Sequence, residues 1–174
     1  MHKPSKAILS ALLFAALQVS AQTTPAANSG ESAWKQLNFL FGNWVGTAGE
    51  KDTPMGSGQG GFSFEPQLNN QIVVRHNHSE YTTGARHHDL MVIYLDAPNT
   101  PPRAIFWDTE GHTVRYNLTF PAANSVVFES EAAQPGPKFR LTYRLDKDVL
   151  NGQFEIAPPG SEYKTYLKWT AKKQ

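Results

Sequence analysis

The chain has 174 residues, no cysteine and a formal net charge of +1 at neutral pH. The lack of cysteine excludes disulfide bridges and a lipid-modified cysteine, and the balanced charge argues against nucleic acid or an anionic membrane surface as a partner. The length suits a single domain that is large enough to bury its own core.

The N-terminus has the pattern of a signal peptide. Lys3 and Lys6 precede an uncharged apolar run over residues 7–19, which ends in Val19-Ser20-Ala21. A charged segment, a short apolar segment and small residues at a cleavage point are the three parts of such a leader, and the run is shorter than the roughly twenty residues that span a bilayer. We expect cleavage after Ala21, export to the periplasm or the medium, no membrane span, and a flexible tether over residues 22–32.

Residues 33–174 are predicted to form one all-β domain, a single antiparallel up-and-down β-barrel of about ten strands with a short N-terminal capping helix. Ser32 is a candidate N-cap for a helical turn that carries Trp34, Leu37 and Leu40 along one face. Beyond it, polar and apolar residues alternate, and Gly, Pro, Asn or Asp clusters interrupt them every eight to twelve residues. The predicted strands span residues 44–50, 58–64, 71–81, 88–95, 103–108, 113–120, 125–131, 138–145, 149–156 and 163–171.

Closure of these strands into a barrel follows from their two-faced pattern. Phe139, Leu141 and Tyr143 alternate with charged or polar residues, which gives a sheet with one dry and one wet face. Many such strands in one sheet must remove their edges by closing. A barrel of about ten strands is wider than the eight-stranded kind whose interior side chains can fill, so we expect a cavity for a small ligand.

Two motifs at the start of the barrel carry a family resemblance. Leu37-Asn-Phe-Leu-Phe-Gly-Asn-Trp44-Val-Gly46 places a Gly-x-Trp motif at the first strand, and Gly56-Ser-Gly58-Gln-Gly60-Gly61 forms a Gly-rich second strand. Together they resemble the calycin superfamily and, more narrowly, the nitrobindins and related exported bacterial lipocalin-like proteins. The resemblance implies a lipocalin-like barrel, structural roles for Gly42, Trp44 and Gly46, and a Trp44 side chain that plugs the barrel base.

The resemblance also raises haem as a ligand. Nitrobindins hold haem through a histidine near the end of the last strand, in a His-Leu-x-Ala pattern that aligns here with Tyr166-Leu167-Lys168-Trp169. A tyrosine therefore stands where the resemblance needs a histidine. Tyrosinate ligates ferric haem in catalase, but alternation with Leu167 and Trp169 predicts that Tyr166 points outward. No cofactor is assigned, and haem and a divalent metal remain alternatives.

Histidines gather in one part of the chain. Five of the six lie between residues 76 and 112. A five-residue hairpin loop over residues 82–86 would place His76, His78, Glu80 and His88 on one face of two neighbouring strands. That face also carries the apolar residues Ile72, Val74, Leu90, Val92 and Tyr94. We therefore predict that it faces the barrel interior.

The histidine cluster allows three interpretations. His76, His78, His88 and Glu80 could hold a metal as a two-His-one-carboxylate or three-His set at a barrel mouth. They could also bind a ligand carboxylate or act in acid–base chemistry. A loop one residue longer or shorter would instead move His88 to the opposite face from His78, because side chains alternate along a strand. The register of the hairpin decides whether His78 and His88 lie on the same face.

The predicted ligand-binding residues combine the histidines His76, His78 and His88 with apolar walls. The apolar lining is predicted to be Ile72, Val74, Leu90, Val92, Phe106, Tyr116, Leu118, Phe128, Phe139, Leu141, Tyr143, Leu167 and Trp169. Trp107 and Arg115 are predicted to lie on the outer surface. The segment Asp108-Thr-Glu-Gly-His112 is predicted to be a hairpin turn, because Gly-centred polar clusters are typical of turns.

Function is less defined than fold. The sequence contains no Gly-x-Ser-x-Gly elbow, phosphate-binding loop, His-Glu-x-x-His pair or nucleophilic cysteine, so it points to no reaction. We expect an exported barrel that binds a small apolar or amphipathic molecule. One alternative is a metal- or haem-dependent enzyme or sensor that uses His76, His78 and His88. A second is a structural envelope protein with a filled barrel, which predicts no cavity and an exposed apolar patch.

Overall fold

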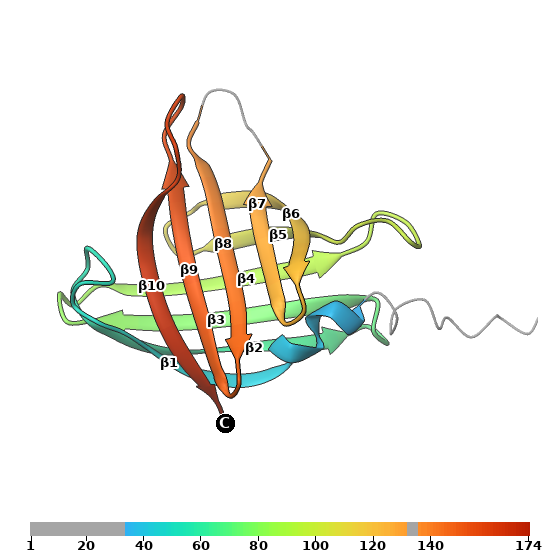
Figure 1. Ribbon diagram of the computed structural model, residues 1–174, viewed down its shortest axis with the longest axis horizontal. Coiled ribbons are helices and arrows are strands. Elements are labelled where there is room, and N and C mark those ends of the chain that lie inside the picture. The colour runs from blue at the N-terminus through green and yellow to red at the C-terminus, as the bar shows by residue number, and fades with distance from the viewer. Residues whose placement is uncertain (1–33, 132–135) are drawn as a thin grey trace, which may run out of the picture.

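The computed structural model describes residues 34–131 and 136–174, in which a short 3-10 helix precedes a closed antiparallel barrel of ten strands (Figure 1). The elements are η1 (Lys35–Leu40), β1 (Gly42–Ala48), β2 (Gly58–Gln67), β3 (Ile72–Tyr81), β4 (Arg86–Tyr94), β5 (Arg103–Asp108), β6 (Thr113–Ala122), β7 (Ser125–Ser130), β8 (Lys138–Asp146), β9 (Val149–Ala157) and β10 (Lys164–Lys173). The predicted signal peptide, tether and Ser32 cap lie outside the described residues.

The strands form a simple meander in which each pairs with its neighbour in sequence. The ring closes where β1 pairs antiparallel with β10, with Trp44 opposite Lys173. The strands β2, β3 and β4 run crosswise to β8, β9 and β10 (Figure 1). The predicted fold class is confirmed: each predicted strand is present, and its ends shift by at most three residues.

Helix η1 covers one end of the barrel. Leu37 and Leu40 are fully buried, and the indole Nε1 of Trp34 donates a hydrogen bond of 2.8 Å to the carbonyl oxygen of Asn70 in the β2–β3 turn. Trp44 donates from its Nε1 to the carbonyl oxygen of Leu40 at 2.7 Å, and its ring stacks on that of Phe62. Trp44 thus plugs this end of the barrel, the position that the resemblance implies.

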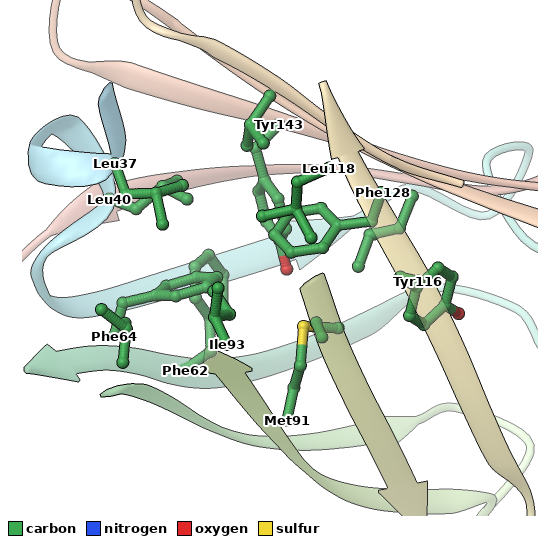
Figure 2. Packing of buried hydrophobic residues seen from close by; sticks show 14 of the residues in the cluster. Leu37, Leu40, Phe62, Phe64, Met91, Ile93, Tyr116, Leu118, Phe128 and Tyr143 are labelled. Atoms are coloured by element: carbon green, nitrogen blue, oxygen red, sulfur yellow. The ribbon is translucent and has the colours of Figure 1, made fainter. Parts of the chain in front are cut away.

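Apolar side chains fill the half of the barrel next to η1. Figure 2 shows Leu37 and Leu40 of the helix above Phe64, with Ile93, Met91 and Tyr143 completing the packing. The aromatic rings meet edge to face: Phe64 and Phe128 each pack against Tyr143, with centroids 5.5 and 6.2 Å apart. Such contacts add to the free energy gained from burial. The β3–β4, β5–β6 and β9–β10 connections lie at the other end of the barrel.

Candidate functional site

A cavity of about 450 Å³ occupies the barrel interior at the end away from η1. The lining side chains of β8, β9 and β10 are apolar or aromatic, whereas most polar ones come from β3, β4 and the β5–β6 turn; β2, β5 and β6 add further apolar side chains. In a closed ring of ten strands, β3 and β4 lie opposite β8 and β9. The apolar wall is formed by Phe139, Leu141, Phe154, Ile156, Leu167 and Trp169, and the polar wall by Arg75, Asn77, Ser79, His87, Asp89, Asp108, Glu110 and His112. We call this space the amphipathic cavity.

Aromatic packing builds the apolar wall. Trp169 lies flat against Gly152 on the neighbouring strand, where a Cβ atom would stand only 2.0 Å from Trp169 Cε2. The indole then meets the ring of Tyr143 edge to face at 5.6 Å. Phe139 and Phe154 stack on each other at 5.9 Å. The missing side chain at Gly152 therefore allows Trp169 to form part of the wall.

A buried ion pair anchors the polar wall. Arg75 and Asp89 are 5% and 8% exposed and pair through Nη1 and Oδ1, while the Asn77 amide donates to Asp89 Oδ2 at 2.8 Å. Burial alone would raise the pKa of Asp89, but the charge of Arg75 and the hydrogen bonds from His87 and Asn77 outweigh it, so the pKa lies below its usual value. The Arg75 guanidinium also lies 5.7 Å from the centre of the Phe62 ring. Asp89 is thus held as a carboxylate inside the barrel.

His87 connects this ion pair to the cavity mouth. Its Nε2 donates to Asp89 Oδ2 at 3.0 Å, and its Nδ1 lies 3.0 Å from Glu110 Oε2. The hydrogen bond to Asp89 raises the pKa of His87 above its usual value; burial opposes this shift, and the charges of Asp89 and Glu110 add to it. At the same mouth, Asp108 accepts hydrogen bonds of 2.8 Å from the backbone and the ring Nδ1 of His112. The segment 108–112 is the predicted hairpin turn, and it brings two carboxylates to His87.

The predicted histidine cluster lies outside the barrel, so the prediction of an interior face was wrong. The β3–β4 loop is two residues shorter than predicted: Tyr81 pairs with Ala85, and His78 faces His88. The shorter loop keeps His76, His78, Glu80 and His88 on one face, but all four are exposed. On the opposite face, which points inward, Asp89 accepts hydrogen bonds from Arg75 and Asn77.

The same correction applies to part of the predicted lining. Ile72, Val74, Leu90 and Val92 share the outer face and do not border the cavity. Phe106, Tyr116, Phe139, Leu141, Leu167 and Trp169 do border it, and Leu118, Phe128 and Tyr143 lie in the core beneath. On the outer surface Trp107 is 40% exposed and Arg115 is also exposed.

Sequence reasoning missed the polar wall. Arg75, Asn77, His87 and Asp89 share one face of two paired strands, with Asn77 directly opposite Asp89. The sequence did contain a signal for this wall. Arg75 and Asp89 have opposite charges, lie among apolar residues, and occupy positions whose side chains point to the same face of the paired strands. Because a buried charge needs a partner, this match could have indicated an interior ion pair.

Tyr166 is the residue that aligns with the haem-binding histidine of the resemblance. Tyr166 lies at a bulge of β10, is 39% exposed and packs edge to face on Phe154. It lies at the rim of the cavity. The resemblance needs a histidine at this position, and the tyrosine that stands there does not match it.

Comparisons with known proteins support the fold alone. No protein-family model matches the chain, and no curated protein matches it. The crystal structure of Rv2717c from M. tuberculosis is similar, with a TM-score of 0.60 and 15% identity over 82% of this chain and 97% of that one. A de novo designed fluorescence-activating β-barrel aligns at a TM-score of 0.41 and 12% identity over 78% of this chain and 94% of that one. Within the described residues, no helix is long and apolar enough to cross a bilayer.

Proposed function

We propose that this protein binds a small amphipathic molecule in the amphipathic cavity. The observation that carries the proposal is the division of one cavity of about 450 Å³ between an apolar wall and a polar wall. Ligand sites are typically concave and mainly apolar, with a few polar groups that fix orientation. The apolar body of the ligand would lie against Leu167 and Trp169, and its polar end would reach Asn77 and His87.

The polar wall favours a ligand group that both donates and accepts hydrogen bonds. The charge of Arg75 is offset by its ion pair with Asp89, so the wall does not present a lone cation. At the mouth, Glu110 accepts hydrogen bonds, while His87 donates to Asp89 and presents its other ring nitrogen. A hydroxyl, amine or amide meets such a mixed surface better than a lone carboxylate does.

A fluorescent apolar amine, N-phenyl-1-naphthylamine, tests this proposal. We expect saturable binding at one site per chain with enhanced emission. Leu167→Trp fills the cavity and should weaken binding at least about tenfold, or about 1.4 kcal/mol. Val45→Trp is the matched control, because Val45 is 47% exposed on the outer face and its replacement should leave binding unchanged. Absent binding, or equal loss in both variants, would contradict the proposal.

We also propose that the protein acts outside the cytoplasm, supported by the leader pattern of residues 1–21. The calycin-like opening and the likeness in fold to Rv2717c support a lipocalin-like carrier. The cavity opposes the filled-barrel alternative, since that alternative predicts no internal space. His76, His78 and His88 share the outer face and do not line the cavity, so the enzyme alternative gains no support from the interior geometry that it assumed.

A further inference from the structure

We propose that His87, Asp108 and Glu110 bind a divalent first-row transition-metal ion at the mouth of the amphipathic cavity. Each residue offers one ligand atom, and these atoms lie within 4.8 Å of one another. Two ligands of a zinc-sized ion, each about 2.1 Å from it, stand about 3–4 Å apart. The observed spread of up to 4.8 Å is slightly wider than that spacing, so binding requires a small adjustment of the three side chains.

The orientation of His87 is the strongest argument for the site. Histidines that bind metals almost always donate their other ring N–H to a carboxylate or carbonyl, which fixes the ring and its tautomer. Here Nε2 donates to Asp89 Oδ2, and Asp89 is itself held by Arg75 and Asn77. The Asp89 side chain is only 2% exposed, so this support is rigid. Nδ1 faces Glu110, whose Oε2 lies 3.0 Å away.

Hydrogen bonds also hold the second proposed ligand, Asp108, in place. Its side chain is 6% exposed and accepts hydrogen bonds from the backbone N–H and the ring of His112. The β5–β6 turn fixes this geometry, with Gly111 N–H bonded to the Asp108 carbonyl oxygen and Gly111 at a φ of +88°. Because a left-handed φ suits glycine, the sequence specifies the turn that delivers Asp108 and Glu110.

The donor set indicates the class of ion. One imidazole with two carboxylates suits Zn²⁺, Mn²⁺ or Fe²⁺ better than Ca²⁺ or Mg²⁺, which prefer all-oxygen sites. A bound ion would replace the contact of 3.0 Å between His87 Nδ1 and Glu110 Oε2. All three residues border the cavity, and three protein ligands leave coordination positions open toward it. This inference does not depend on the amphipathic ligand.

The test uses Co²⁺ alone as the probe, added to chelator-treated protein that carries no affinity His-tag. We expect one Co²⁺ per chain, with visible absorption bands, and displacement by Zn²⁺. Glu110→Gln removes an exposed ligand that the fold does not need, and it should weaken Co²⁺ binding at least about tenfold, since even the partners of a ligand contribute that much. His87→Gln should do the same.

The control is His78→Gln, which removes a histidine from the exposed cluster on the outer face. We expect it to bind Co²⁺ as the unaltered protein does. The inference is overturned if no stoichiometric Co²⁺ binds, if Glu110→Gln binds normally, or if His78→Gln abolishes binding. Protein that binds N-phenyl-1-naphthylamine but no Co²⁺ contradicts the metal site and leaves the proposed function standing.

Discussion

Asp89 illustrates how a single side chain can hold a polar wall inside a barrel. It accepts from Arg75, Asn77 and His87 while only 2% of its side chain is exposed. We predict that Asp89→Asn lowers the free energy of unfolding by about 3–5 kcal/mol, because it leaves the buried Arg75 charge without its partner. Urea denaturation followed by circular dichroism measures this loss.

A control for Asp89 lies on the same hairpin. Glu80 pairs with Arg86 at 3.3 Å, but their side chains are 57% and 72% exposed. Glu80→Gln should therefore change the free energy of unfolding by no more than about 1 kcal/mol. Similar losses in both variants would mean that the interior ion pair stabilises the fold no more than a surface pair does.

Glu155 gives a prediction of pH dependence. Hydrogen bonds from Arg140, at 2.7 and 2.9 Å, lower its pKa below the ordinary value of 4.5; burial opposes the shift, and the Arg140 charge adds to it. A carboxyl with a lowered pKa stabilises the fold above its ordinary pKa, and this contribution is lost as the pH falls through the lowered value. The difference in unfolding free energy between the unaltered protein and Glu155→Gln should thus shrink as the pH falls below the ordinary pKa of 4.5. Parallel pH profiles would contradict this assignment.

At the scale of elements, the pairing of β9 with β10 depends on one glycine. Gly152→Ala would place a methyl group where Trp169 now lies, 2.0 Å from Cε2. We predict a loss of about 1–3 kcal/mol in unfolding free energy, a changed near-ultraviolet circular dichroism spectrum and weaker binding of N-phenyl-1-naphthylamine. Asn151→Ala, at an exposed position of the same strand, serves as the control and should change none of these. An unchanged spectrum for Gly152→Ala would show that Trp169 does not need this contact.

The β3–β4 hairpin shows what the alternation of polar and apolar residues can predict and what it cannot. The loop is two residues shorter than predicted. Because side chains alternate with a period of two, a change of two residues in loop length leaves the same side chains together on one face. His76, His78 and His88 were thus correctly placed together, yet on the outside of the barrel. Alternation within a strand says which residues are together but not which face is inside, and here apolar residues occupy both faces.

At the scale of the whole molecule, the two ends of the barrel differ in structure. Helix η1 and Trp44 close one end, and the other opens on the amphipathic cavity. For the chain as a whole we predict that expression in an exporting bacterial host gives a mature protein that begins at Gln22. Intact mass spectrometry measures the end of the chain, and Ala21→Lys should retain the leader. A full-length, unprocessed product of the unaltered gene would contradict export.

The sequence by itself determined the strands, their meander order and the closed barrel, because alternation and turn residues are local signals. It also identified the aromatic side chains of β8 and β10 that face inward, since those strands have one clearly apolar face. Only the tertiary structure decided that β3 and β4 turn Arg75, His87 and Asp89 inward and leave His78 and His88 outside. The physical reason is that a buried polar group is stable only with its partners, and those partners come from different strands and from the β5–β6 turn, which meet only in the folded barrel.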